Sequence, residues 1–479
     1  MSPGTPLSEI SRPESPTLMR PLFILPAVLL VSSCVMGPEP GSPDIKTPGS
    51  IRGDQAPHGA SFGDQAWRKV FTDSTLRTLI ARSLHNNPDM VAATYRIEEA
   101  RAQVGIAYSG WFPMLNGAAD AAANYGSVNA GQVAAGSSRH SQSYSLTGLL
   151  SWEIDLWGGI RRTNQAARAR LLSSEAQRDG VQTSLVAAVA SAYIDLQNLD
   201  ERLAISRRTT ASRKASLDLV TSRRNGGISS DLEVGQAEAL LAQAQVLIPT
   251  TERGIAAKEN EIRALLGEYP GGITRGGSLA SLESAVHIAG GLPSSLLARR
   301  PDLAAANQDF QAATAEIGVY EALRFPTLTL TGSGGLISTD LNHLLQGKSG
   351  AYSIGPQLAG PIFDAGRIGF GVKAAQARAR IALAAYQKAA QSAFQEAADS
   401  LNSYQKTGEI IAEETRLVAS EKNVSALALD RFQGGASSYL EVLDAERGLF
   451  TAELDLADAR SNRLRSVVQA YRALGGGWK

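Results

Sequence analysis

Apolar and polar residues alternate in two separate parts of the chain, which predicts β-strands whose two faces meet different surroundings. In the first half, one face would carry Tyr144, Leu146, Gly148, Leu150, Trp152 and Ile154. The opposite face would carry Ser143, Ser145, Thr147, Ser151, Glu153 and Asp155, with Leu149 as an exception. In the second half, the apolar set is Tyr352, Ile354, Pro356, Leu358 and Ile362, preceded by Leu328 and Leu330 between threonines. We therefore expect two pairs of two-faced strands.

Long helical segments follow each pair of predicted strands. The first should run from about residue 161 to residue 222, and both return segments carry apolar residues at intervals of seven. One row is Leu241, Ile248, Ile255 and Ile262, and the other is Leu443, Phe450, Ala457, Leu464 and Tyr471. Such spacing keeps one stripe against a neighbouring helix and favours left-handed supercoiling. Pro249 should kink or interrupt the first return helix, because proline lacks an amide hydrogen.

One short stretch occurs twice and predicts where the helices reverse. Residues 223–234 read RRNGGISSDLEV, and residues 431–442 read RFQGGASSYLEV. A glycine pair between helix-forming segments is typical of a reversal, because glycine accepts the positive φ that ends a helix. Ser-x-x-Glu follows each pair, from Ser230 to Glu233 and from Ser438 to Glu441, and predicts a capping box. The chain should contain two long helical hairpins with similar tips.

Further motifs indicate that the whole chain is duplicated. Asn87-Pro88-Asp89 returns as Arg300-Pro301-Asp302, and Trp111-Phe112-Pro113 returns as Arg324-Phe325-Pro326. The predicted fold is mostly α with a β part, in the order helix, strand, strand, long helix, turn, long helix. The predicted segments are a first repeat at 67–270 (strands about 112–157, hairpin about 161–266), an equatorial inter-repeat linker at 271–298, and a second repeat at 299–479 (strands about 324–364, hairpin about 367–474).

The strands have two possible settings on this evidence. They could form a half-buried sheet in a soluble protein, or the wall of a transmembrane barrel with lipid outside and water inside. Each is long enough for the second setting, since spanning takes roughly 9–11 tilted residues. Four strands cannot close a barrel, because about eight is the smallest number known. Membrane strands would therefore require an oligomer, whereas a plain coiled-coil dimer would explain the heptads but not the strands.

Gly-rich segments are interpreted as the loops between paired strands. They lie at about residues 126–140 and 334–350, and Gly332-Ser333-Gly334-Gly335 is interpreted in the same way. Such residues are typical of exposed connections.

The N-terminus has the features of an export signal. Residues 21–31 are apolar, but they are too few to span a bilayer, which needs about 20 residues. Residues 1–33 are interpreted as a signal peptide. Translation is expected to start at Met19, because Glu9 and Glu14 are unusual ahead of such a run.

Val31-Ser32-Ser33-Cys34 is similar to a bacterial lipobox, in which the cysteine becomes the lipidated first residue of the mature chain. The alternative is an ordinary signal peptide with a chance cysteine. Residues 34–66 would form a lipidated tether, because they are rich in Pro, Gly and Ser.

Composition excludes several classes of function. The chain has 46 Lys and Arg and 46 Asp and Glu, and zero formal charge argues against nucleic-acid binding. Cys34 is the only cysteine, so neither a disulfide framework nor a thiolate metal site can form within one chain. The histidines lack His-Glu-x-x-His spacing, and neither a phosphate loop nor a nucleophile elbow occurs. We expect no enzyme, metal or cofactor, apart from a covalent lipid on Cys34.

These motifs resemble those of the TolC-type outer membrane factor family, in particular its lipoprotein branch, the NodT-type or OprM-like channels of tripartite efflux systems. The resemblance rests on the lipobox, Gly37-Pro38, the duplicated Phe-Pro strands, Asp155-Leu156-Trp157-Gly158 and the paired Gly-Gly-x-Ser-Ser tips. It covers about residues 34–474. It implies a homotrimer whose chains together supply a twelve-stranded β-barrel in the outer membrane and a twelve-helix α-barrel in the periplasm.

The resemblance also implies a function and partners. The trimer would be the exit duct of an efflux or export system, anchored in outer-membrane lipid and extending into the periplasm. An inner-membrane pump of the RND type would deliver substrates through a periplasmic adaptor (membrane fusion) protein. The alternative is a structural periplasmic coiled-coil lipoprotein without channel activity. The cargo stays open, because the pump and the adaptor would select it.

In this family, acidic residues beyond the second tip ring the periplasmic constriction, and Glu441 and Asp444 match those positions. They lie three residues apart on one helical face, and such a ring favours cations. Glu233 matches the corresponding position after the first tip, and Phe432 matches an aromatic position before the second. Capping boxes alone would explain Glu233 and Glu441, whereas Asp444 has no capping role.

The tip glycines match the positions at which adaptors dock, although turn chemistry explains them equally well. They are Gly226, Gly227, Gly434 and Gly435. Gln236 stands where a second acid would follow the first tip, so only the second repeat carries the acidic pair. Ser437 occupies a position that is basic in some relatives, so an ion-pair lock through that residue is not expected.

Overall fold

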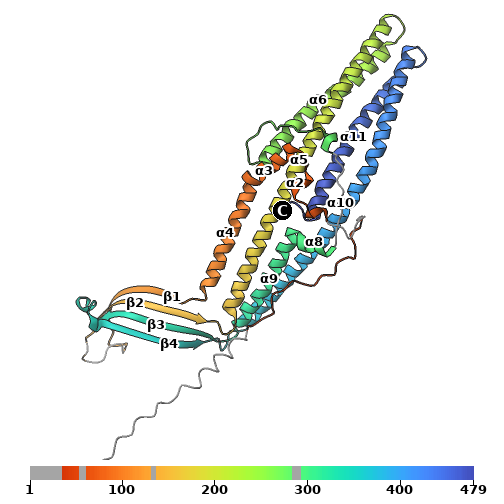
Figure 1. Cartoon of the computed structure of the whole chain (residues 1–479). Coiled ribbons are helices and arrows are strands. Elements are labelled where there is room, and N and C mark those ends of the chain that lie inside the picture. The colour runs from red at the N-terminus through yellow and green to blue at the C-terminus, as the bar shows by residue number, and fades with distance from the viewer. Residues whose placement is uncertain are drawn as a thin grey trace, which may run out of the picture. The chain divides into compact units, whose positions relative to one another are not determined.

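The computed structural model describes residues 35–52, 61–130, 138–282 and 293–478, together with Gly136 and Ile288. The predicted signal peptide, the start at Met19 and Cys34 lie outside the described residues. The chain forms two compact units, to which both halves of the sequence contribute (Figure 1). The sheet unit comprises Trp111–Arg161, Gly318–Ala365 and the segment ending at Gly37, and the helical unit comprises Pro38–Gly110, Arg162–Ile317 and Gly366–Lys479.

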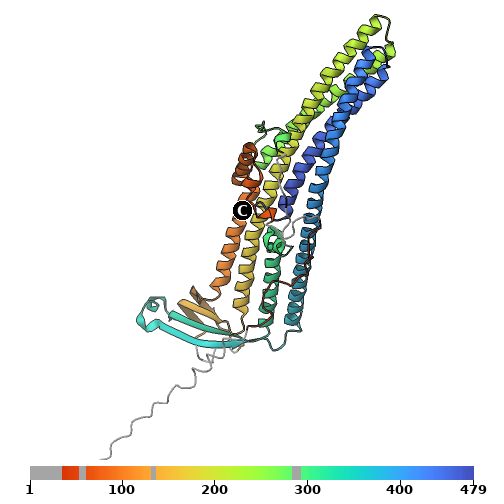
Figure 2. The same cartoon turned by 45° about the vertical axis from the view of Figure 1, so that its right-hand side comes forward.

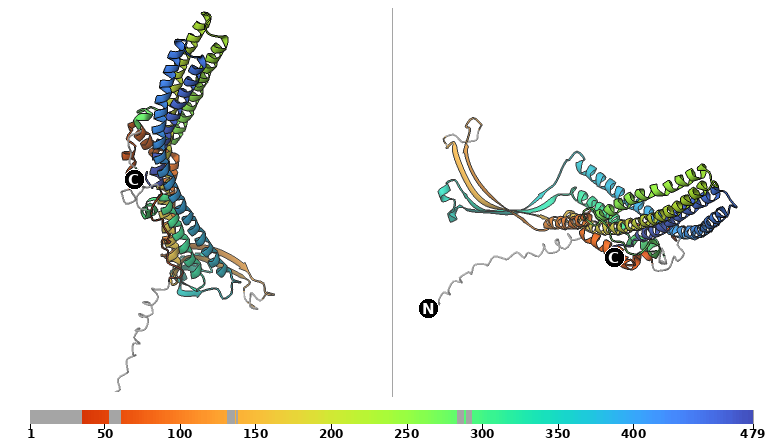
Figure 3. Two further views of the ribbon diagram at one scale, coloured as in Figure 1. Left: turned by 90° about the vertical axis from the view of Figure 1, so that its right-hand side faces the viewer. Right: turned by 90° about the horizontal axis from the view of Figure 1, so that it is seen from above.

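Four antiparallel strands in chain order make up the sheet: β1 (Met114–Tyr125), β2 (His140–Ile154), β3 (Thr327–Ser338) and β4 (Gly350–Ala359). Figure 3 shows them as one curved sheet. The two predicted strand pairs are confirmed, and β2 additionally pairs with β3, which joins the two halves of the chain. Strands β1 and β4 are the edges of this sheet.

The register shows that the sheet has one apolar and one polar face. Leu150 pairs with Leu115 and Gly332, and Ile154 pairs with Leu328, which pairs in turn with Leu358. Paired residues share a face. The apolar face carries Leu115, Leu146, Leu150, Trp152, Ile154, Leu328, Leu330, Leu336, Tyr352, Ile354 and Leu358, and the other carries Asn116, Asp120, Ser145, Thr147, Ser151, Glu153, Thr329, Thr331, Ser353 and Gln357, with Met114, Leu149 and Ile337 as exceptions.

The interpretation of the Gly-rich stretch at residues 332–335 as a loop is wrong. These residues lie within β3, where Gly335 pairs with Thr147. A Cβ on Gly335 would lie 2.1 Å from the carbonyl oxygen of Leu146, so glycine permits this close approach between strands. Strand β4 ends at Ala359, so Ile362 lies beyond the strand and does not belong to its apolar face.

Two long helical hairpins dominate the helical unit. Helices α5 (Gly159–Asn225) and α10 (Arg367–Gln433) have 67 residues each, and the return helices α6 (Asp231–Leu265) and α11 (Tyr439–Ala473) have 35 each. The equal lengths agree with the predicted duplication. The hairpins run side by side, and their tips lie at the same end of the helical unit (Figure 1, Figure 2).

Shorter elements complete both units. Helices α4 (Pro88–Ser109) and α9 (Pro301–Ala322) have 22 residues each and begin at the repeated prolines. The others are η2 (Phe62–Asp64), α2 (Trp67–Val70), α3 (Ser74–Asn86), α7 (Leu279–Leu282) and α8 (Pro293–Arg299) in the helical unit, and η3 (Leu341–His343) and η4 (Gly347–Ser349) in the sheet unit. Within the described ranges, no helix is both long and apolar enough to cross a membrane.

The Asp-Leu-Trp-Gly motif and the second Phe-Pro motif meet in the sheet unit. Asp155 accepts a hydrogen bond from the Ile160 amide at 3.1 Å, which caps the start of α5. The Trp157 indole donates to the carbonyl of Pro326 at 2.8 Å, and its ring stacks on Phe325 with 4.6 Å between centroids. These contacts connect the ends of β2 and the start of β3.

The heptad prediction is confirmed for α11, where four of the five row residues are buried and Phe450 is half-buried. In α6, the predicted row is only half-buried except at Ile262. The buried stripe consists instead of Ala237, Leu240, Ala244, Thr251 and Ile262, of which only Ile262 belongs to the predicted row. Small side chains there let neighbouring helices approach closely. Helix α6 also continues through Pro249, because packing along a long helix outweighs one lost hydrogen bond, so no interruption occurs.

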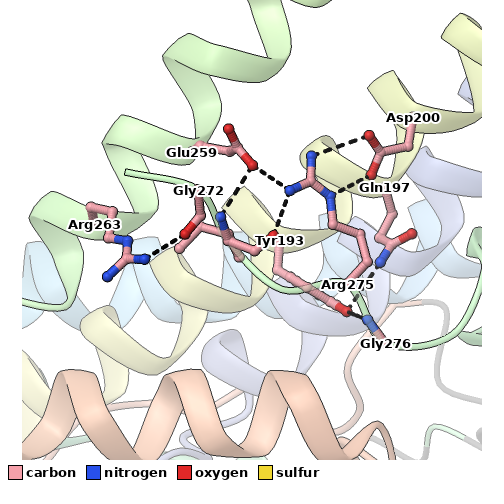
Figure 4. Close-up of polar contacts among 9 residues, drawn as sticks. Tyr193, Gln197, Asp200, Glu259, Arg263, Gly272, Arg275 and Gly276 are labelled. Carbon is pink, nitrogen blue, oxygen red and sulfur yellow. Dashed lines mark hydrogen bonds and ion pairs between the residues drawn. The ribbon is translucent and has the colours of Figure 1, made fainter. Parts of the chain in front are cut away.

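A polar network fastens the linker to the first hairpin (Figure 4). The Arg275 Nε donates to Asp200 on α5 at 2.9 Å, and the same guanidinium pairs with Glu259 on α6. Glu259 also accepts a hydrogen bond from the Ile273 amide at 3.1 Å. The linker is thus tied to both helices of the hairpin, and we call these four residues the linker clasp.

A tyrosine extends this network toward the main core. The Tyr193 hydroxyl accepts hydrogen bonds from the Gly276 amide at 2.8 Å and from Gln197 at 3.0 Å (Figure 4). Arg263 on α6 donates to the carbonyl of Gly272. Tyr193 is fully buried, so the linker backbone supplies a partner that its hydroxyl needs.

The linker clasp should depend on pH through Glu259. Burial by itself would raise the pKa of this carboxyl, but hydrogen bonds from Arg275 and from the Ile273 amide bring the pKa below its usual value of 4.5. A lowered folded pKa means that the stabilisation is present above the unfolded pKa and is lost as pH falls through the folded pKa. We expect hydrogen exchange at Ile273, corrected for intrinsic rates, to accelerate below about pH 4.5.

In Glu259→Gln, exchange at Ile273 should already be fast at neutral pH. Glu261→Gln is the matched control, because Glu261 is more exposed than Glu259 and its ion pair in the described part of the chain is with Lys258 on its own helix. Mass spectrometry of peptides covering the linker measures both. Equal protection in both variants at every pH would contradict the clasp.

Candidate functional site

The first hairpin tip folds as the sequence predicts. Gly227 adopts φ of 76°, in the left-handed region that ends a helix. The Ser230 hydroxyl accepts a hydrogen bond from the Glu233 amide at 3.3 Å, and the Glu233 carboxylate accepts one from the Ser230 amide at 2.8 Å. The predicted capping box is confirmed here, and it orients Glu233 at the start of α6.

The second tip has the same turn but a different cap. Gly435 has φ of 73°, and Ser438 is the N-cap of α11, yet its side chain accepts no capping hydrogen bond. The predicted capping box is therefore wrong at this tip. The Glu441 carboxylate instead lies toward Arg431, with 4.0 Å between Oε2 and Nη2. Glu441 is consequently free of the capping role that explains Glu233.

Glu441 and Asp444 lie together on an exposed face of α11, as their spacing predicts. They line a groove of about 700 Å³ between α10 and α11. Its charged lining residues are Glu421, Glu441, Asp444, Asp455, Arg431 and Arg447. Carboxylates outnumber guanidinium groups, so the groove has an acidic excess that would favour cations.

Phe432 lies in the core beneath the tips, not on the surface with the acidic pair. It is 3% exposed, and its ring contacts Tyr439 with 5.3 Å between centroids. The Arg223 guanidinium lies 4.6 Å from the Phe432 ring and donates to the Gln433 carbonyl at 3.2 Å. Arg223 belongs to the first hairpin, so Phe432 contributes to packing between the two tips.

One apolar cluster, which we call the tip core, joins all four hairpin helices. It consists of Val220, Ala237, Leu240, Ala428, Phe432, Tyr439, Val442, Leu443 and Ala445. The docking candidates Gly226, Gly227, Gly434 and Gly435 form the exposed turns above it. The tip core sets how the acidic pair is presented, because both acids are on the helix that it packs.

Sequence reasoning missed a buried polar group beside the tip core. Glu446 and Arg213 are 8% and 2% exposed, and Ser216 is also buried. The available signal was a charged residue within the buried stripe of α11, three positions after Leu443. Its partners lie on α5, far away in the sequence, and no local pattern indicates them.

Among the residues that the structure describes, no three His, Cys, Asp or Glu side chains gather as metal ligands. The groove and the tips present charged side chains and no constellation of nucleophile, base and oxyanion donor. Two helical hairpins with acidic tips and one two-faced open sheet define the class of outer-membrane channel proteins. Comparison with known proteins agrees with that class.

The family model described as outer membrane efflux protein matches residues 79–268 and 292–476, so the chain belongs to the outer membrane efflux protein family. The chain is 33% identical over 471 residues to the solvent efflux pump outer membrane protein SrpC of Pseudomonas putida, covering 96% of this chain and 98% of that one. It is 32% identical to the cation efflux system protein CusC of Escherichia coli, covering 96% and 100%. The solved outer-membrane channel OprN superposes with a TM-score of 0.87 at 30% identity, covering 93% and 100%.

These comparisons confirm the predicted family, the fold class and an outer-membrane efflux function, and they favour a channel over the structural lipoprotein. The family match falls into two segments.

The two tips should respond differently to the loss of their N-cap serines. Ser230→Ala removes a capping hydrogen bond that is worth about 1 kcal/mol, so hydrogen exchange in the first turn of α6 should accelerate roughly fivefold. Ser438→Ala should leave the first turn of α11 nearly unchanged, because that side chain makes no cap. Equal acceleration at both tips would contradict the observed difference in capping.

Proposed function

We propose that the chain is the outer-membrane exit duct of a tripartite efflux or export system and acts as a homotrimer. The observation that carries this proposal is the two-faced sheet with two free edges. Pairing β4 of one chain with β1 of the next would close a ring of three sheets. The apolar face would meet lipid and the polar face would line a water-filled lumen.

The exposed apolar residues of the sheet support this arrangement. Leu115, Ile354 and Leu358 are 74%, 67% and 66% exposed in the single chain. Edge strands also present unpaired amide and carbonyl groups, which hydrocarbon cannot satisfy. Closure by further copies removes both problems at once, whereas a soluble sheet would need an additional layer over its apolar face.

The helical unit would form the periplasmic part of the duct, with a gate at its tips. Glu441 and Asp444 from three chains would ring the pore, and Arg431 supplies a basic neighbour for Glu441. Glu233 and Phe432 would support the gate from the first tip and from the tip core. A periplasmic adaptor would dock at Gly226, Gly227, Gly434 and Gly435, and an inner-membrane pump of the RND type would deliver cargo for passive passage.

Lipidation of Cys34 would anchor the chain beside its sheet. The residues that follow Cys34 contact the sheet unit: the Met36 amide donates to the Trp157 carbonyl at 3.1 Å. A Cβ on Gly158 would lie 3.0 Å from the Cα of Val35, so this segment packs closely against the end of β2. A lipid on Cys34 would thus start next to the part of the chain that we place in the membrane.

The cargo does not follow from these features. One relative is named for solvent efflux and another for cation efflux, although both cover nearly the whole chain. The duct sequence therefore tolerates different cargo, and selection would belong to the pump and the adaptor.

The purified protein should give discrete channel openings in planar lipid bilayers. Glu441→Ala combined with Asp444→Ala should raise the conductance or the open probability, because the acidic side chains and their hydrogen bonds would constrict the closed pore. Asp455→Ala is the matched control, since Asp455 lines the same groove further from the tip. A protein without any openings would refute the duct, and unchanged openings in the double variant would refute only the gate.

Cys34→Ala should abolish incorporation of labelled palmitate and change the mass of the mature N-terminus, while channel openings in bilayers remain. Ser33→Ala keeps the cysteine and serves as the control for labelling. Label in the Cys34→Ala protein would contradict lipidation at this residue.

A further inference from the structure

A buried polar cluster connects the two hairpins just behind the acidic pair. The Glu446 Oε1 on α11 accepts a hydrogen bond from the Ser216 hydroxyl on α5 at 2.5 Å. The Arg213 guanidinium, also on α5, donates to the Leu240 carbonyl on α6 at 2.7 Å and lies 4.8 Å from the Phe450 ring on α11. We call Arg213, Ser216 and Glu446 the latch.

The latch is incompletely satisfied in the described residues. Glu446 Oε2, Arg213 Nε and the Tyr439 hydroxyl are buried there without a hydrogen-bond partner. Burial raises the pKa of Glu446, lowers the pKa of Arg213, and raises the pKa of Tyr439 to about 12. All three pKa shifts are in the direction that favours the neutral form of the group. Burying these polar groups therefore lowers the stability of the closed packing.

Other ion pairs between α5 and α11 are more exposed to solvent. Arg208 pairs with Glu453 at 3.3 Å, and its side chain is 58% exposed. Arg202 pairs with Asp458 at 2.7 Å. Exposed ion pairs contribute little to stability, and salt screens them. Removing one partner of a buried polar contact is strongly destabilising, because the other partner is left buried without compensation.

We propose that Glu446 and Arg213 are positioning residues of the gate, which hold α11 against the first hairpin so that Glu441 and Asp444 face the pore in the closed state. This inference rests on the proposed duct. Glu446 lies two residues after Asp444 on the same helix. A movement of α11 that carries the acids out of the pore must withdraw Glu446 from its pocket.

The proposed latch would have a closed arrangement, with Glu446 in its pocket, and an open arrangement, with Glu446 withdrawn from it. In the closed state, the pairing with Ser216 and the attraction between Glu446 and Arg213 offset part of the cost of burial. In the open state, water reaches the polar atoms that lack partners and restores their hydration. The difference between the two states is therefore small, and contacts made at the tips can shift it.

Single-channel recording of the full protein tests the latch through a double-mutant cycle. Glu446→Gln leaves Arg213 buried without an opposite charge, so the open probability should rise by about tenfold or more. Arg213→Met should act in the same direction. The double variant Arg213→Met with Glu446→Leu should return to wild-type gating, because apolar side chains of similar volume can replace buried groups of opposite charge.

Glu453→Gln is the matched control. Glu453 lies one heptad from Glu446 and belongs to the exposed pair, so its loss should change the open probability by no more than about twofold. Thermal stability of the assembly and hydrogen exchange at residues 439–450 are measured for every variant. Gating that changes while thermal stability stays the same identifies positioning, as opposed to general destabilisation.

The outcomes separate the two proposals. A wild-type protein without openings overturns the duct and the latch with it. Normal openings that Glu446→Gln leaves unchanged, or single effects that add in the double variant, overturn the latch and leave the duct standing. Effects of Glu453→Gln as large as those of Glu446→Gln also overturn the latch, because they would show that any charge on this face of α11 matters equally.

Discussion

Unpaired backbone at the two edges of the sheet is the constraint on which this structure depends. Four strands in chain order leave one side of β1 and one side of β4 without strand partners, and the same strands expose an apolar face. Each feature is a liability, since an exposed edge can pair with another strand and an exposed apolar patch marks a contact surface. Both would be resolved by the edge-to-edge joining of identical sheets in lipid that we propose. The two faces of the sheet, its four strands and the membership of the outer membrane efflux protein family are all consistent with a sheet that needs further copies to be completed.

The two hairpins show how a duplicated sequence acquires unequal roles. Both tips turn through a left-handed glycine and both carry Ser-x-x-Glu, yet the capping box forms only at the first. At the second tip, Tyr439 enters the tip core against Phe432, and Glu441 lies toward Arg431. The first acid thus stabilises its own helix, whereas the second is available to the groove. The polar clasp around Arg275, in turn, ties the linker to both helices of the first hairpin.

Small apolar residues and a few buried polar groups hold the hairpins together, and each kind contributes in a different way. Alanines at the buried stripe of α6 and within the tip core allow close packing with little side-chain ordering. Packing of that kind is not strongly specific for one position along the helix, because neighbouring turns present similar surfaces. The latch residues Arg213, Ser216 and Glu446 fix the position of α11 along the first hairpin. A buried polar group needs a partner at one particular position on the neighbouring helix, and alanine imposes no such requirement. The gate that we propose would need both properties.

The sequence by itself determined the duplication, the glycine turns, the long helices and the alternation of the strands, because these depend on periodicity and local backbone preference. Tertiary structure alone decided that Gly332–Gly335 lie in a strand, since their pairing with β2 requires residues nearly 190 positions away, such as Thr147. It also decided which stripe of α6 is buried, why Ser438 does not cap α11, and that Glu446 meets Ser216, 230 residues distant. Contacts between remote segments override local preference wherever burial and hydrogen bonding outweigh it.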